Sequence, residues 1–449
     1  MIRTLTLALL TFLPVAALAQ NGDWKLEALH TKAGKSYPGL VLEETPAEVR
    51  FQIVRRAPGR ATAAFTIAVP RADVKRIDKL AAKDREELTA RLAGLDALKS
   101  LELKPQPFVV GTRRKEGLSY ATDHFELISD ASDDVVRRAA LRLEQLDAAL
   151  TYFLPPVSRA QRPNTTTTVL LYQSLDEYHN ILKGQGRDIF NPAWYDASGN
   201  VIIAAADLAP VVKEMGEARR ANDELLERIK KQEAEVKKLP KGEVQDRARE
   251  QLQEARREVA RANARNEELF QRAARMLMRS VQHEAFHAYL VNFVFPASRG
   301  EVPRWLNEGL AQIFEEAIDD AGVLNVGRVE PARLEKARAV ELVPLADLLK
   351  ANGAPFVVGH GQDRQLADRY YLTSWALAHY LMFNSRVVGT PAFDDYLTAL
   401  NGMIDPKTDM RQRGADPVEA LTKLTGQPLP ALEKELRQYV KTLPAEPGK

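Results

Sequence analysis

The alternation of apolar and polar residues divides the chain into a first part rich in strands and a remainder that is mostly helical. Residues 23–78 alternate at a period of two, with turn-forming residues between the runs, which predicts four or five short strands. A small SH3-like, β-barrel-like module is the expected arrangement of these strands. A charged helix over residues 79–104 is expected to connect this module to the next domain.

Beyond residue 104, strands and helices are expected side by side. A helical pattern over residues 135–153 lies between apolar runs of strand length, and residues 344–443 carry further amphipathic helices. The expected strands are residues 125–129, 166–171 and 200–205. These patterns predict an α+β fold class.

Residues 211–268 carry the most regular hydrophobic pattern in the chain. Apolar positions recur in alternating steps of three and four residues from Leu208 to Leu239, stop at Pro240, and then resume at Ala248. This pattern predicts an inserted antiparallel coiled-coil hairpin whose arms are each roughly 45 Å long at about 1.5 Å per residue.

The same steps continue beyond the hairpin through Leu269, Ala273 and Met276 to His283 and His287. We therefore expect the hairpin to run directly into the helix that carries these histidines, and its seam to share their face. The charged hairpin could be a solvated spacer. We favour a docking arm or lid that binds a protein partner, because the insertion lies so close to the histidines.

The segment His283-Glu284-Ala285-Phe286-His287 is the clearest sign of chemistry in this chain. It lies in a run without Gly or Pro that has helical periodicity, so the two histidines project from one face and can bind one metal ion. Glu284 lies one position round the helix, where it can reach a water beside the metal rather than the metal itself. Helix-surface histidines without a ligand are the alternative interpretation.

A third ligand is expected from a second helix. The cluster of turn-forming residues 296–300 ends the first helix, and Pro303 suits the first turn of another that runs to about Ile318. A short loop between two helices folds the second back on the first, which brings Glu308 toward the histidines. Two histidines and one carboxylate are typical ligands of catalytic Zn²⁺. The weaker candidates for this position are Glu301, Glu315 and Glu316.

The segment Trp305-Leu306-Asn307-Glu308-Gly309-Leu310-Ala311 resembles the second zinc motif of gluzincin metallopeptidases. The resemblance makes Glu308 the third ligand and matches Glu315 to a further acidic position. From about Asp123 to the C-terminus, without the insertion, the chain is similar to the peptidase MA-like family of bacterial envelope proteins. That resemblance implies a gluzincin-like domain that binds Zn²⁺, in which residues 200–205 line the cleft and pair with an extended peptide.

The resemblance also implies how the site would act. Glu284 would serve as general base and then as general acid. Tyr371, three residues before Ser374, is in register with the tyrosine that stabilises the oxyanion in aminopeptidase N-like enzymes, and Tyr370 is the alternative. The Gly-x-Met-Glu-Asn segment with which those enzymes hold a free amino terminus does not occur in this sequence. An endopeptidase is therefore favoured over an aminopeptidase.

Four of the other five histidines are expected to be structural, as buried, hydrogen-bonded side chains usually are. They are His124, His179, His360 and His379.

Composition and the first residues indicate where the protein works. Residues 1–19 combine Arg3, an apolar core and the small residues Ala17-Leu18-Ala19, as a cleavable signal peptide does, and the core is too short to serve as a transmembrane anchor. The chain has no cysteine, so neither a lipid anchor at that cleavage site nor a disulfide is expected. A net charge of +2 predicts no attraction to nucleic acid. A periplasmic or secreted protein is expected.

We therefore expect an exported zinc-dependent endopeptidase that acts on a peptide or protein substrate. The alternative is a catalytically inactive, peptidase-like envelope scaffold that binds partners through the hairpin and the N-terminal module. The expected domains are the signal peptide (1–19), the strand-rich module (23–78), the connector (79–104), the first part of the peptidase domain (105–210), the hairpin (211–268) and the zinc-binding part (269–445).

Overall fold

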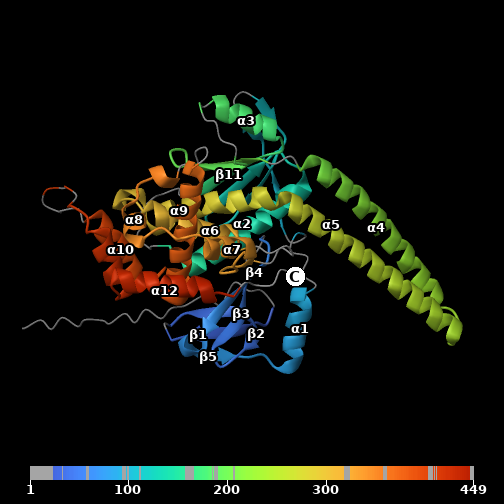
Figure 1. Cartoon of the computed structure of the whole chain (residues 1–449). Coiled ribbons are helices and arrows are strands. Elements are labelled where there is room, and N and C mark those ends of the chain that lie inside the picture. Colours follow the sequence, from blue (N-terminus) through green and yellow to red (C-terminus); the bar gives the residue numbers. More distant parts are fainter. Residues whose placement is uncertain are drawn as a thin grey trace, which may run out of the picture. The chain divides into compact units, whose positions relative to one another are not determined.

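The structure is a computed structural model of the whole chain (Figure 1). It describes residues 24–444 except for residues 33, 57–59, 94–97, 99–100, 111–112, 157–165, 185, 187–190, 206–207, 318–323, 357–361, 403–407, 409 and 411. The predicted signal peptide, residues 1–19, lies outside the described residues. The chain divides into two compact units, which are Met1–Ala63 with Ala68–Ser100, and Ala64–Ile67 with Leu101–Lys449.

The first unit is built on an antiparallel sheet in the order β3-β2-β1-β5. Apolar residues alternate along its strands; for example, Leu29 is fully buried opposite Tyr37 on one side and Ile77 on the other. The four or five strands predicted for this region are confirmed. They are β1 (Glu27–Thr31), β2 (Ser36–Glu44), β3 (Glu48–Arg55), β4 (Ala63–Pro70), which is divided between the two units, and β5 (Val74–Asp78).

The predicted SH3-like barrel is wrong, because this sheet stays open. Among the described residues, β5 pairs with β1 and with no second strand. Helix α1 (Ala82–Ala93) contacts β1 and β2 through a polar side chain. Its Arg85 donates hydrogen bonds to the buried Glu27 carboxylate, 2.6 Å away, and to the Val41 carbonyl oxygen. The helix expected as a connector is therefore part of the first unit.

The second unit contains a mixed six-stranded sheet in the order β12-β13-β11-β10-β9-β6. The central strands β10, β11 and β13 are parallel, and the flanking pairs are antiparallel. The three predicted strands are confirmed to within a residue or two, whereas the shorter β9 and β12 were not predicted. The strands are β6 (Lys104–Pro105), β9 (Leu118–Ala121), β10 (Phe125–Ser129), β11 (Thr167–Tyr172), β12 (Ala193–Asp196) and β13 (Val201–Ala205).

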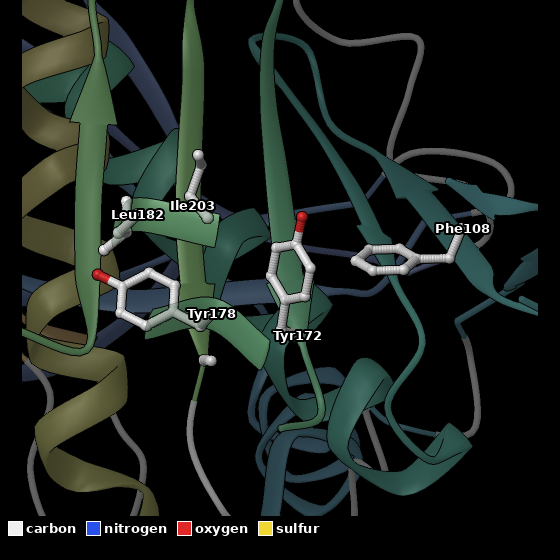
Figure 2. Packing of buried hydrophobic residues seen from close by; sticks show 6 residues of the cluster. Phe108, Tyr172, Tyr178, Leu182 and Ile203 are labelled. Atoms are coloured by element: carbon white, nitrogen blue, oxygen red, sulfur yellow. The ribbon is translucent and has the colours of Figure 1, made fainter. Parts of the chain in front are cut away.

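One face of this sheet is covered by an aromatic cluster (Figure 2). Tyr178 and Leu182, from α3 (Leu175–Gly184), lie against Ile203 of β13. Tyr172, at the end of β11, meets Phe108 edge to face with ring centroids 4.9 Å apart. Phe108 belongs to a separate two-stranded ribbon of β7 (Phe108–Val110) and β8 (Arg113–Lys115).

The opposite face of the sheet carries α2 (Asp133–Phe153) and the C-terminal part of α5 (Glu243–Tyr289). Leu127 of β10 and Val169 of β11 line a small apolar gap together with Leu143 of α2 and Leu277 of α5. Burial of these side chains fixes the C-terminal half of α5 against the sheet, since apolar burial is the main stabilising term in such packing.

The insertion forms two antiparallel helices, α4 (Ala209–Val236) and the N-terminal part of α5, which lie side by side in Figure 1. Asn222 donates a hydrogen bond to Asn263 across the pair, and Glu233 forms an ion pair with Arg256. As expected, α5 continues without a break into the segment that carries both histidines.

The predicted seam is wrong from Leu269 onward. Leu269 and Met276 are 57% and 68% exposed, and the neighbouring Phe270, Ala274 and Leu277 are buried instead. A straight α-helix drifts by about 20° per heptad relative to a strict seven-residue repeat. From Ala248 to Leu269, which are three heptads apart, this drift amounts to about 60°, so steps extrapolated from the hairpin leave the buried face.

The remaining helices follow the histidines in the chain and pack behind them, as predicted for residues 344–443. No helix in the described part of the chain is both long and apolar enough to cross a membrane. The helices are α6 (Arg304–Glu315), α7 (Pro331–Ala339), α8 (Leu345–Lys350), α9 (Gln362–His379), α10 (Pro391–Asn401), α11 (Pro417–Thr425) and α12 (Leu429–Thr442), with the short strand β14 (Leu324–Asn325) after α6.

Candidate metal centre

Two helices bring the predicted ligands together. His283 and His287 lie on α5, which changes to a short π-helical segment at Leu290–Val294 before Pro296 ends it. The returning helix α6 carries Glu308, which is 2% exposed. His283, His287 and Glu308 form a group whose possible ligand atoms all lie within 4.8 Å of one another.

Gly309 lets α6 approach its other neighbour, α9, very closely. A Cβ atom at this position would lie 2.3 Å from the carbonyl oxygen of Ser374 and 2.8 Å from the Cβ atom of Ala378. Only glycine fits there without moving backbone. The residue next to Glu308 therefore holds α6 between α5 and α9.

The imidazole nitrogens of the two histidines have separate partners. The Nε2 atom of His283 lies 3.2 Å from Glu308 Oε2, and that of His287 lies 3.7 Å from Glu308 Oε1. The Nδ1 atom of His283 is 2.7 Å from Glu315 Oε2, and the Nδ1 atom of His287 is 2.8 Å from Asn307 Oδ1. Because Glu315 and Asn307 accept hydrogen bonds from the Nδ1–H groups, both Nε2 atoms are directed to the common point beside Glu308.

The electrostatics of the cluster favour a cation at that point. Burial opposes the charge on His283, but its hydrogen bonds with Glu308 and Glu315 prevail and raise its pKa to about 10. Burial likewise opposes the charge on Glu308, yet the hydrogen bond with His283 and the nearby His287 lower its pKa to about 2. Burial and the charge of His283 lower the pKa of His287 to about 4. A positive charge on His283 thus compensates the buried carboxylates, and a bound metal ion would take over that role.

Glu284 lies beside the cluster and is oriented by the sheet. Its Oε2 atom accepts a hydrogen bond of 3.0 Å from the backbone N–H of Tyr195 in β12. Burial raises the pKa of Glu284 to about 7. A carboxylate whose pKa lies near neutrality can both accept and release a proton under ordinary conditions.

The expectation for residues 200–205 needs correction. β13 is paired on both sides, with β11 and with β12, so its backbone groups are not open to a further strand. β12 is the edge strand of this sheet among the described residues, and it is the strand that contacts Glu284. The sequence did not reveal β12, because it is only four residues long and bears mixed polarity.

Tyr371 lies at the edge of the same site. It belongs to α9, its backbone carbonyl oxygen accepts a hydrogen bond from Gln312 of α6, and its hydroxyl donates to the carbonyl oxygen of Phe356 at 3.3 Å. Burial raises its pKa to about 12, and the charges of Glu308 and Arg304 also act on that pKa. The rings of Tyr370 and Tyr371 both pack edge to face against Phe356.

The weaker candidates for the third ligand have other contacts. Glu315 bonds the far side of His283 and forms an ion pair with Arg333. Glu316 is buried beside Arg333, and burial raises its pKa to about 7. Glu301 exchanges backbone hydrogen bonds with Asn401. Of the described acidic residues, Glu308 is the one grouped with the two histidines.

The other described histidines lie outside this group. His124 forms a hydrogen bond of 2.5 Å with the buried Asp147, and His379 contacts the Tyr439 hydroxyl at 2.7 Å. His179 lies on α3, in the layer on the other face of the sheet. His360 falls outside the described residues.

Several residues of the site could not be identified from the sequence as parts of it. Arg304, one turn before Glu308, places its Nη2 atom 2.9 Å from Glu308 Oε1, and Arg333 holds Glu315. Spacing contained one usable signal. Glu308 and Glu315 are seven residues apart and therefore share a face of α6, so an antiparallel helix with histidines four residues apart can meet both.

Comparison with known proteins identifies one domain in part of the chain. No curated protein matches it. A family model described as "Protein of unknown function (DUF1570)" matches residues 278–391, which include both histidines, Glu284, Glu308, Glu315 and Tyr371. Residues 278–391 are therefore a DUF1570 domain, and the candidate ligands lie within it.

Proposed function

We propose that the protein is an exported zinc-dependent metallopeptidase of gluzincin type, with endopeptidase rather than aminopeptidase activity. The observation that carries the proposal is the common direction of the two Nε2 atoms and the Glu308 carboxylate, with a second carboxylate, Glu284, directly beside them. Two imidazoles and one carboxylate form a donor set that suits zinc and leaves a position open.

The buried surroundings support this assignment. Both Nδ1 atoms are engaged by Asn307 and Glu315, as is usual for histidines that bind a metal through the other nitrogen. Glu308 keeps one oxygen toward Arg304 and the other toward His283. When bound, zinc would polarise the scissile carbonyl group and lower the pKa of a water molecule.

The chain's own groups have distinct roles in the proposed reaction. Glu284 accepts a proton from the attacking water and transfers it to the leaving amine, and the Tyr195 N–H keeps its carboxylate in place. Tyr371 is protonated at neutral pH, since burial raises its pKa to about 12, so its hydroxyl can donate to the developing oxyanion. To do so, the Tyr371 hydroxyl gives up its hydrogen bond to the Phe356 carbonyl oxygen and donates to the substrate.

Metal content and hydrolysis together test the proposal. The purified chain should retain about one zinc per molecule by elemental analysis, and His287→Ala should lose most of it. The zinc-loaded protein should cleave casein or members of a quenched peptide library, and chelation should stop cleavage until zinc is restored. Glu341→Gln is a matched control, because this glutamate is 85% exposed and distant in sequence from the ligands.

The second candidate is an inactive peptidase-like scaffold that binds a partner through the hairpin. Exposed apolar residues on α4 and α5, such as Leu225 and Val244, favour it. Zinc alone does not distinguish the two, because an inactive domain can retain metal. A zinc-loaded chain that cleaves neither casein nor any library peptide would favour the scaffold.

A further inference from the structure

The face of α5 that carries the metal ligands continues toward the hairpin as an exposed apolar strip. Leu269 and Met276 are 57% and 68% exposed, and Ala273 between them is exposed too. At 100° per residue, Leu269, Met276, His283 and His287 lie within about 40° of one another around the helix axis. Leu269, Ala273 and Met276 form the α5 strip, which therefore leads directly to the candidate metal centre.

Arginines flank the α5 strip. Between residues 256 and 279 the helix has seven arginines and three glutamates. Arg272 pairs with Glu268 and Arg279 with Glu330, whereas Arg265 has no carboxylate partner among the described residues. The strip thus combines exposed apolar area with an excess of positive charge.

A polar cavity of about 180 Å³ lies against α5, and it is lined by Met278 rather than by Met276. Arg275 and Arg279, which flank Met276, line it together with Arg328. Its glutamates already have cationic partners, Arg279 for Glu330 and Arg333 for Glu315 and Glu316. The buried Gln282 side chain also lines the cavity, and its Nε2 donor has no partner within the described structure. The cavity is therefore lined by arginines and a glutamine amide, and donors of this kind suit a carboxylate.

We propose that the α5 strip binds a segment of the polypeptide substrate in which apolar residues alternate with acidic ones. This inference rests on the proposed peptidase function and identifies its substrate class. The segment's apolar side chains cover Leu269, Ala273 and Met276, and an acidic side chain enters the cavity beside Arg275. The α5 strip and the histidines of the metal centre lie on one face of the same helix. We therefore assign the strip to the substrate and not to another protein.

The geometry sets a length for this segment. Leu269 precedes His283 by fourteen residues, or about 21 Å of helix at 1.5 Å per residue. An extended peptide advances about 3.3 Å per residue, so it must reach about six residues beyond the scissile bond to cover the strip. Short peptides cannot reach it, and longer ones can.

The test compares quenched peptides that share one cleavable core. One peptide is the bare core, and two carry eight-residue extensions at both ends, made either of alternating Leu and Glu or of Gly and Ser. They are assayed with the wild-type chain, with the double variant Leu269→Glu, Met276→Glu, and with Val244→Glu. Val244 is a matched control because it is 76% exposed on the same helix, at the end far from the histidines.

We expect the Leu/Glu extension to raise kcat/KM at least tenfold over the Gly/Ser extension in the wild type and in Val244→Glu. In the double variant that ratio should fall to about one, because the added carboxylates repel the acidic segment. An undiminished ratio in the double variant would overturn the inference and leave the peptidase proposal intact. A wild-type dimer that the double variant converts to monomer would also overturn it, because the occupant would then be a second copy.

Binding measured without turnover separates this inference from the proposed function. The labelled Leu/Glu peptide is titrated with zinc-loaded Glu284→Gln by fluorescence anisotropy, with and without the two strip substitutions. If no peptide is hydrolysed by the wild type, the peptidase proposal fails. A tenfold or greater loss of affinity on strip substitution would still support the strip as the docking site for an acidic–apolar segment, and equal affinities would refute it.

Discussion

The two ends of α5 belong to one continuous helix of 47 residues, yet they differ in nearly every contact. Around His283 and His287 the side chains are enclosed by α6, β12 and α2, and each polar atom of the candidate metal centre has a specific partner. Around Arg256 the helix packs against α4, and exposed ion pairs dominate its surface. Exposed pairs of this kind contribute little to stability.

This difference shows that helical periodicity alone does not define a functional site. Both ends of α5 have the same apolar spacing, and the partners of each end decide whether the polar face is solvated or organised for chemistry. Changes at the histidine end should therefore affect turnover and the fold, whereas changes at the hairpin end should affect neither strongly.

The largest effect is expected from Glu284→Gln. Gln is nearly isosteric and leaves the ligands in place, but it cannot accept a proton, so kcat should fall at least 10²-fold while zinc content stays unchanged. Peptide hydrolysis and elemental analysis measure the two quantities. Wild-type turnover in this variant would contradict the proposed mechanism.

Tyr371→Phe should reduce kcat by about 10- to 10³-fold, because a metal ion would still carry part of the oxyanion charge. Tyr370→Phe is the matched control on the same helix, since the Tyr370 ring packs on Phe356. If Tyr370→Phe gave the larger loss, the roles of the two tyrosines would have to be exchanged.

Acid should destabilise the enclosed region through His379. This side chain is 3% exposed, and burial lowers its pKa to about 4. Below about pH 6.5 the unfolded chain binds a proton at this residue that the folded chain does not bind. The free energy of unfolding should therefore fall by up to about 3 kcal/mol between pH 6.5 and pH 4. Urea unfolding at several pH values measures this slope, and His379→Gln should flatten it; an unchanged slope would exclude His379 as its source.

Two glycines compare the two regions directly. Gly309→Ala inserts a methyl group against the backbone of α9 and should lower the free energy of unfolding by about 1–3 kcal/mol. Gly216→Ala, in α4, meets nothing within 4 Å and should raise it by about 0.5–1 kcal/mol through better helix propensity. Denaturant unfolding measures both changes. If the free energy of unfolding changed in the same direction in both variants, the two regions would not differ in packing as described.

The smallest effect on small peptides is expected from shortening the hairpin. Replacing Glu224 to Gln253 by a tight turn keeps the α5 strip and the contacts of Asn263 with α4, so zinc binding and cleavage of short peptides should persist. A docking arm predicts slower cleavage of the natural protein substrate, through lost binding energy remote from the reacting bond. Equal losses on both kinds of substrate would instead mark the outer hairpin as support for α5, and no loss on either would favour the solvated spacer.

The sequence by itself determined the local elements and the ligand candidates. A run without Gly or Pro and a four-residue spacing were sufficient to place His283 and His287 on one helical face, and the turn at Pro296 was sufficient to bring Glu308 back toward them. The alternating runs likewise gave the central strands to within a residue or two, because a pattern of period two or 3.6 is a local property of the chain.

Only the tertiary structure decided which groups surround those residues. The edge position of β12, the contact of Tyr195 with Glu284, and the contact of α1 with the open first sheet depend on interactions between distant segments. The exposed face of Leu269 and Met276 was likewise hidden from the sequence, because a straight helix drifts away from a seven-residue repeat by an amount that becomes decisive over several heptads.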